Sequence, residues 1–243
     1  MARTVKEHEH TAKRNEILNA AQLLIFSKGY ERMTIKDILA HLKISSGAFY
    51  HYFDSKQAVL EGFIERIQEE TEKPLLPILN DPHLSAIEKL LGFFGTLDSL
   101  RTAHKAKVIQ LLRVWYTDEN AIVRQKVDEA VREQRAPLLE EIVRQGVQEG
   151  VFSTPYPAQA GEVILSLLQG MGNTHAKLLL SLDQEVVTKN YEQRCIEEIT
   201  STYAAYMSAI ERVLGSPPNS LQRPDAVEAV KMWVTAQQAS PPD

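Results

Sequence analysis

The sequence of 243 residues is short of several features that define whole classes of protein. Its single cysteine, Cys195, excludes an internal disulfide framework and a paired-cysteine zinc site, and it is typical of a reducing compartment. No apolar run approaches the roughly 20 residues that a membrane-spanning helix needs. The charged N-terminus MARTVKEHEH lacks the apolar centre of a secretory signal. The sequence therefore predicts a cytoplasmic protein without a membrane partner.

Catalytic and cofactor motifs are also absent from the sequence. There is no GxSxG, HExxH, P-loop or Rossmann glycine fingerprint. The seven histidines form no i, i+4 metal-binding pair with a third ligand nearby, and His8 and His10 are explained by a loose, solvated tail over residues 1–10. We therefore expect no enzymatic activity, no metal and no cofactor.

Helical periodicity recurs along the whole chain, while the alternation of apolar and polar residues that marks strands is scarce. The hydrophobic fraction of 44% and the charged fraction of 24% are those of an ordinary globular protein. The prediction is an all-α fold.

Residues 33–56, MTIKDILAHLKISSGAFYHYFDSK, form the most informative stretch. Four apolar residues lie at i, i+3, i+4 and i+7 and form one stripe: Ile35, Ile38, Leu39 and Leu42. This stripe predicts a short helix, and Thr34 just before it is the expected N-cap. A corner at residues 43–45 separates it from a second short helix, capped by Ser45 or Ser46, whose Phe49 and Phe53 can pack back on the first. Two short helices around such a corner predict a helix-turn-helix unit.

The outward residues of this unit suit a polyanion. Small residues at the start of the second helix permit close approach to a surface, and hydrogen-bond donors follow them at its far end. Residues 1–60 carry nine Lys and Arg against six Asp and Glu, a net charge of +3, whereas the rest of the chain carries −8. This asymmetry favours double-stranded DNA as the partner of the N-terminal part.

The run RNEILNAAQLLIFSKGYERMTIKDILAHLKISSGAFYHYFDSKQAVL resembles the DNA-binding domain of TetR-family transcriptional regulators. The resemblance implies that the second helix enters the major groove, that Thr34, Tyr50, His51, Tyr52 and Lys56 hold phosphates, and that Lys36, Ser46, Gly47 and Ala48 lie where the family reads bases. The predicted DNA-binding set is Thr34, Lys36, Ser45, Ser46, Gly47, Ala48, Tyr50, His51, Tyr52 and Lys56.

Three residues depart from the usual pattern of that family. Lys43 stands at the corner where glycine is common, and a positive φ there would strain it by about 1 kcal/mol. Ser46 stands where a lysine is common in the family, and Ala48 where a threonine is common. Both shorten the side chains with which the second helix could reach the bases. Ala48 can still offer its methyl group to thymine, and base specificity is expected to depend on Lys36 and on DNA shape.

The expected domains are the helix-turn-helix domain at 11–56, a helical ligand-binding and dimerisation domain at 74–215, and a Pro-rich hinge with a short helix, 225–238, at 216–243. A helix at 55–73 links the first two, either as a mechanical connection or as a plain spacer. Pro137 is expected to kink or break a helix over about 120–149.

Two sets of residues are candidates for further functions of the helical domain. The candidate ligand pocket comprises Phe93, Phe94, His104, Trp115, Tyr116, Met171 and His175, with plain core as the alternative. The resemblance implies that the last two long helices pair with their copies in a dimer, with burial inside one chain as the alternative. The candidate dimer residues are Ile164, Leu168, Gly172, Tyr203, Met207 and Ile210.

The sequence thus predicts a homodimeric repressor that binds a pseudo-palindromic operator and is released from it by a small molecule. The alternative is a regulator or adaptor of the same fold that activates or that responds to no ligand.

Overall fold

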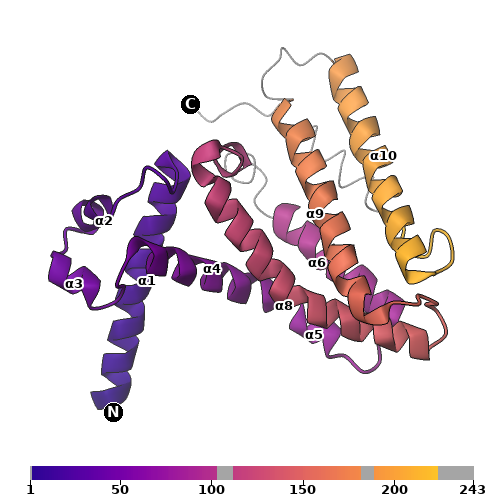
Figure 1. Ribbon diagram of the computed structural model, residues 1–243, viewed down its shortest axis with the longest axis horizontal. Coiled ribbons are helices and arrows are strands. Elements are labelled where there is room, and N and C mark those ends of the chain that lie inside the picture. The colour runs from indigo at the N-terminus through magenta and orange to yellow at the C-terminus, as the bar shows by residue number, and fades with distance from the viewer. Residues whose placement is uncertain (1, 103–111, 182–188, 224–243) are drawn as a thin grey trace. The chain divides into compact units, whose positions relative to one another are not determined.

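The computed structural model describes residues 2–102, 112–181 and 189–223, and within these ranges it contains helices and no strand (Figure 1). The all-α prediction is confirmed. The helices are α1 (Ala2–Lys28), α2 (Ile35–Leu42), α3 (Ser46–Tyr50), α4 (Lys56–Glu72), α5 (Leu76–Leu79), α6 (Ala86–Thr102), the 3-10 turn η1 (Asp118–Asn120), α8 (Ala121–Gln148), α9 (Pro157–Ser181) and α10 (Lys189–Leu214). Residues 112–115 are also helical. The predicted helix 225–238 and His104 lie outside the described residues.

Helix α1 begins at Ala2, so the loose tail expected over residues 1–10 is helical instead. These residues include no glycine or proline, and alanine, arginine, lysine and glutamate are strong helix formers, so the helix extends back from Thr11. At its other end Gly29 adopts a φ of +85°, and its N–H donates to the Ile25 carbonyl at 3.0 Å. This glycine ends α1 in the conformation that a side chain would strain.

The chain divides into two compact units, and the first is discontinuous in sequence. Unit 1 comprises Met1–Glu70 and Arg113–Ala130; unit 2 comprises the described residues of Thr71–Leu112 and Val131–Asp243. Helices α4 and α8 each contribute residues to both units. The sequence-based division did not anticipate that residues 113–130 belong with the helix-turn-helix.

The core of unit 1 joins α1, α2, α3 and α4. Its largest fully buried side chains are Ile17, Leu18, Ile25, Met33, Ile38, Phe49, Leu60 and Phe63. Two arginines hold α1 and α4 together at the surface of this core. Arg14 pairs with Glu65 at 3.1 Å, and Arg66 donates to the Asn19 side chain at 2.7 Å.

Unit 2 contains α5, α6, the rest of α8, α9 and α10. Its apolar core includes Leu90, Phe93, Leu139, Ile164 and Ile210, all fully buried. Helix α8 runs through Pro137 without the break that the sequence allowed. The burial of Leu139, Ile142 and Val143 just after the proline offsets its lost hydrogen bond and steric clash. Helices α9 and α10 pack against each other within the chain.

Candidate nucleic-acid interface

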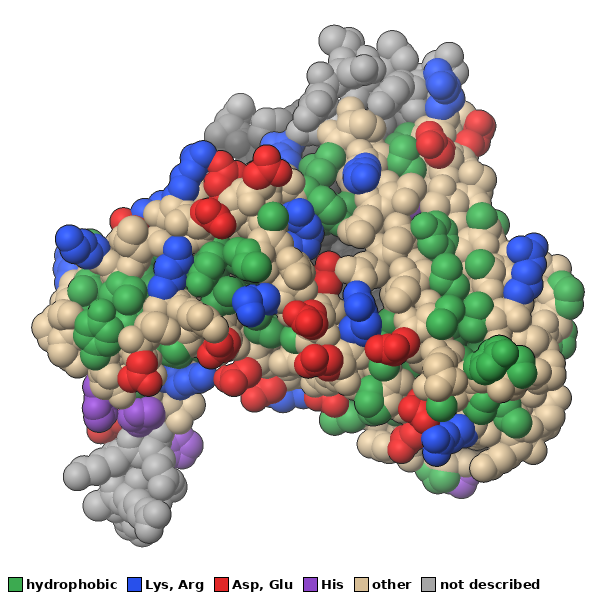
Figure 2. All heavy atoms as spheres, viewed as in Figure 1, with side chains coloured by type: hydrophobic (Ala, Val, Ile, Leu, Met, Phe, Trp, Pro, Cys, Tyr) green, Lys and Arg blue, Asp and Glu red, His purple; other side chains and the backbone are tan. Residues whose placement is uncertain are grey.

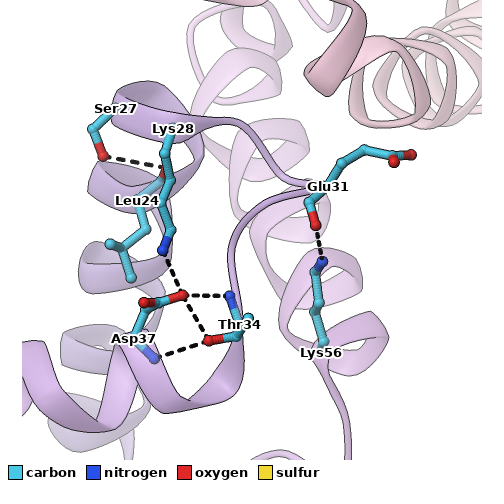
Figure 3. Close-up of polar contacts among 7 residues, drawn as sticks. All are labelled: Leu24, Ser27, Lys28, Glu31, Thr34, Asp37 and Lys56. Atoms are coloured by element: carbon cyan, nitrogen blue, oxygen red, sulfur yellow. Dashed lines mark hydrogen bonds and ion pairs between the residues drawn. The ribbon is translucent and has the colours of Figure 1, made fainter.

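Helix α2 begins at a capping box between Thr34 and Asp37 (Figure 3). The Asp37 N–H donates to the Thr34 hydroxyl at 3.2 Å, and the Thr34 N–H donates to the Asp37 carboxylate at 2.7 Å. The Lys28 ammonium joins the same carboxylate oxygen at 2.5 Å. Hydrogen bonds from Lys28 and Thr34 lower the pKa of Asp37 to about 2. The predicted cap is confirmed, and its Lys28 contact connects the end of α1 to the start of α2.

The corner between α2 and α3 is closed by Lys43, whose φ of 54° and ψ of 42° are left-handed. Its own N–H bonds to the Leu39 carbonyl, and the Ile44 N–H bonds to the same oxygen at 3.2 Å. Of the two caps considered for the next helix, Ser45 is the one observed, with its hydroxyl accepting the Ala48 N–H at 3.2 Å. The strained corner that the sequence suggested at Lys43 is therefore present.

Phe49 and Phe53 face inward, as predicted, and leave the opposite side of α3 open. Phe49 is fully buried and its ring centroid lies 6.2 Å from that of Phe53. The exposed members of the predicted DNA-binding set are Thr34, Lys36, Ser45, Ser46, Gly47, Tyr50 and His51, while Ala48, Tyr52 and Lys56 are half-buried. A Cβ added to Gly47 would meet no atom within 4 Å, so internal packing does not require a glycine there. The outer face of α2 and α3 is thus free to contact a partner.

Two of the residues expected to hold phosphates already have contacts inside unit 1. The Thr34 hydroxyl donates to the Asp37 carboxylate at 2.6 Å. The Lys56 ammonium donates to the Glu31 carbonyl at 3.2 Å (Figure 3). The same ammonium lies 4.3 Å from the centroid of the Tyr30 ring. Burial lowers the pKa of Lys56 and raises that of Tyr30. Lys56 therefore also fixes the loop between α1 and α2, a role that the sequence did not indicate.

His10 is a neighbour of this face that the sequence reasoning missed. Its ring centroid lies 4.7 Å from that of Tyr52 and 5.6 Å from that of His51. Figure 2 shows histidine side chains gathered at this end of α1. The continuous helix-forming composition of residues 2–16 was the signal that could have placed His10 there.

The segment 113–130 completes unit 1 through a fully buried asparagine. Asn120 accepts the Tyr30 N–H at 2.8 Å and donates to the Ile25 carbonyl at 3.2 Å and the Val114 carbonyl at 3.1 Å. Its neighbour Glu119 pairs with Arg32. These contacts fix the end of α1 and the loop that leads into α2, so the position of the helix-turn-helix depends on a segment about 90 residues away in sequence.

The described ligand candidates are divided between the two units. Phe93, Phe94 and Met171 lie together in the core of unit 2. Trp115 lies in unit 1, where its ring centroid is 6.4 Å from that of Phe26. The Cζ atom of Arg124 lies 5.2 Å from the centroid of the Tyr116 ring. The ligand-binding role of each residue, including His175 on α9, stays a prediction.

The dimer candidates also separate into two groups. Ile164, Met207 and Ile210 are almost completely buried within their own chain, as the one-chain alternative predicts for them. They would bury no further area in a dimer. Leu168, Gly172 and Tyr203 are half-buried and stay candidates for an interface.

No group of three His, Cys, Asp or Glu that could hold a metal ion occurs among the described residues. In the same ranges, no helix is long and apolar enough to cross a membrane.

Two stretches of the chain match known domain families. Residues 17–62 match bacterial regulatory proteins of the tetR family, and residues 110–190 match the tetracyclin repressor-like C-terminal domain. The chain belongs to the TetR family of DNA-binding transcriptional regulators. The resemblance stated from the run over residues 14–60 is thereby confirmed. The members of this family are transcriptional regulators, and one relative, KstR2, is a transcriptional repressor.

Curated TetR-like relatives match parts of the chain. The nucleoid occlusion factor SlmA of Photobacterium profundum is 36% identical over 75 residues, which are 30% of this chain and 38% of SlmA. The HTH-type transcriptional repressor KstR2 of Mycolicibacterium smegmatis is 28% identical over 147 residues, which are 58% of this chain and 68% of KstR2. The chain therefore spans from about a third to two thirds of the length of these relatives.

Solved structures share the fold at low identity. A regulator from Pectobacterium atrosepticum aligns with a TM-score of 0.57 and 18% identity, covering 86% of this chain and 98% of that one. A complex of SmeT with triclosan aligns with a TM-score of 0.55 and 17% identity, covering 88% and 98%.

Proposed function

We propose that this TetR-family regulator is a homodimeric repressor that binds a pseudo-palindromic operator and leaves it when a small molecule binds unit 2. The observation that carries the proposal is the outer face of α2 and α3, where Lys36, Tyr50 and His51 are exposed beside the small residues that open α3. Backbone N–H groups, phenols and a lysine suit phosphates and base edges.

A dimer is part of the proposal because two copies of the helix-turn-helix would match two operator half-sites one helical turn apart. Leu168, Gly172 and Tyr203, which are half-buried on α9 and α10, are proposed to lie in its interface. Repression is favoured over activation by the likeness to KstR2, a transcriptional repressor.

Release by a ligand is proposed because α4 and α8 each run from unit 1 into unit 2. A ligand that binds unit 2 more tightly in one arrangement of α4 and α8 would shift the population toward that arrangement. This shift would change the spacing between the two helix-turn-helix units of the dimer. The apolar core around Phe93, Phe94 and Met171 suits a largely apolar effector. The structural relative SmeT binds one small molecule, triclosan.

The DNA-binding part is tested by selecting operator fragments from genomic DNA with the purified protein. Tyr50→Phe removes one hydroxyl from the exposed face and should weaken binding to all sequences by about threefold to tenfold. Lys36→Ala should instead change the preferred sequence, with discrimination at one base pair falling by roughly 1–3 kcal/mol. Lys56 is a poorer probe, because its removal would also release the loop at Glu31.

If both variants select the wild-type sequences with unchanged affinity, the assignment of this face is wrong. The ligand part is tested by a thermal-shift screen, since a compound that binds the native state raises its melting temperature. A compound that stabilises the protein must also release the operator. Stabilisation with retained or tighter operator binding would favour an activator or a regulator that senses by another route.

A further inference from the structure

Lys43 combines a strained backbone with an ammonium group that has no partner among the residues that the structure describes. Among the described residues, Lys43 and Asn219 are the non-glycine residues with positive φ, and asparagine tolerates that conformation better than lysine does. A glycine at the corner would fold without this cost. Residues with a strained backbone cluster at binding and catalytic sites, so the observed strain motivates a search for a function of this side chain.

The backbone N–H of Lys43 is hydrogen-bonded, whereas its side chain has no partner in the described part of the chain. Its N–H and that of Ile44 both donate to the Leu39 carbonyl, which fixes the corner. The side chain is exposed and has no hydrogen bond or ion pair with any residue that the structure describes. Lys43 stands two residues before Ser45, the cap of α3, so its flexible stem starts beside the N-terminus of the reading helix.

Several other cations of unit 1 have contacts inside the protein. Lys28 binds Asp37, Arg32 binds Glu119, Lys56 binds the Glu31 carbonyl, and Arg14 binds Glu65. Lys36 and Lys43, one on α2 and one at its end, have no such partner within the described ranges. Their charges are therefore available to an anion outside the chain.

We propose that Lys43 binds a DNA backbone phosphate at the edge of the groove that α3 enters. The inference rests on the proposed DNA-binding face and adds a contact to it. The side chain would supply a positive charge at the N-terminal end of α3, where Ser46 and Ala48 offer little reach. A glycine at the corner would be unstrained but could not make this contact.

The experiment compares Lys43→Gly, Lys43→Asn and Lys43→Arg with the wild type on the operator selected by the wild-type protein. Affinities are measured from about 50 to 200 mM salt, because each lost phosphate contact reduces the salt slope by about 0.9. Lys73→Gln is the matched control, since Lys73 is an exposed lysine of unit 2.

Lys43→Gly should raise the melting temperature by about 2–4 °C while weakening operator binding roughly threefold to tenfold at low salt. Lys43→Asn should lose as much operator affinity and as much salt slope as Lys43→Gly. Because asparagine is less flexible than glycine, an equal loss would exclude flexibility of the corner as the cause. Lys43→Arg should retain both, and Lys73→Gln should bind like the wild type.

Unchanged affinity and slope in Lys43→Gly and Lys43→Asn, with a wild type that binds its operator normally, would overturn this inference and leave the proposed function intact. A wild-type protein that selects no DNA would overturn both. A loss of affinity without a change of slope would also count against a phosphate contact.

Discussion

Asp37 shows how one side chain determines where the DNA-binding motif begins. Its carboxylate accepts hydrogen bonds from the Thr34 N–H, the Thr34 hydroxyl and the Lys28 ammonium. These donors favour the charged form, which is why the pKa of Asp37 falls from 3.8 to about 2. The start of α2 and the end of α1 are thus joined through a single ionised group.

The stability that Asp37 contributes should depend on pH in a defined direction. Because its folded pKa is below its unfolded value, the contribution is present above pH 3.8 and is lost as the pH falls through about 2. The difference in melting temperature between wild type and Asp37→Asn should therefore be constant from about pH 5 to 8 and shrink below pH 3.8. Thermal melts followed by circular dichroism measure it. A difference that grows on acidification would contradict the assignment.

Residues with local partners were predictable from the sequence. Thr34 and Ser45 cap the helices that follow them, because a cap needs only an acceptor about three residues before a free N–H. The inward direction of Phe49 and Phe53 follows from their spacing of four. The partners of Lys56 were not predictable, since Glu31 and Tyr30 are reached only after the chain turns between α1 and α2.

At the scale of elements, the segment 113–130 supports the helix-turn-helix through Asn120. This residue bonds to Ile25, Tyr30 and Val114, and no periodicity or motif in the sequence relates it to α1. Pairings between segments about 90 residues apart depend on how the whole chain packs, which local patterns do not encode. Most of the helices were predictable from their apolar stripes, although α1 begins earlier than expected, but this connection was not.

Removing the Asn120 amide should destabilise unit 1. Asn120→Ala leaves the partly buried Tyr30 N–H without its acceptor and the Ile25 and Val114 carbonyls without their donor, and the expected cost is about 2–3 kcal/mol. Asn120→Asp keeps the acceptor but places a carboxylate beside two carbonyl oxygens, so it should be at least as harmful. Asn80→Ala, at an exposed residue of unit 2, is the control and should change stability by less than about 0.5 kcal/mol. Urea unfolding measures all three, and an Asn120→Ala value near that of the control would refute the role.

For the whole molecule, the residues predicted to form the dimer divide into those that one chain already buries and those that a second copy could still cover. Ile164, Met207 and Ile210 were predicted at the interface because an apolar stripe on a helix is equally suited to a neighbour in the same chain or in a second copy. The amphipathic pattern alone does not distinguish these two cases. Gly172 remains only partly covered, and it permits close approach of another helix.

A bulky charge at Gly172 should therefore dissociate the proposed dimer. In sedimentation velocity the wild type should have twice the mass of one chain, whereas Gly172→Arg should shift toward one chain and lose at least tenfold affinity for a two-half-site operator. Glu141→Arg, at an exposed residue of α8, provides the control for added charge. A wild type with the mass of one chain would refute the dimer. A Gly172→Arg protein that stays fully dimeric would remove Gly172 from the interface.

The discontinuity of unit 1 has a consequence for how the protein is made. Its two segments, Met1–Glu70 and Arg113–Ala130, are separated by more than forty residues of unit 2. A nascent chain that has emerged only as far as α4 therefore carries the helices of the reading head but lacks Asn120, so Tyr30 and Ile25 still lack the partners that fix them. Unit 1 therefore cannot be completed before Ala130 has left the ribosome. By then, residues 71–112 of unit 2 have already been synthesised. Proteolysis or premature termination between the two segments would leave a fragment with the complete DNA-reading sequence but an incompletely supported fold.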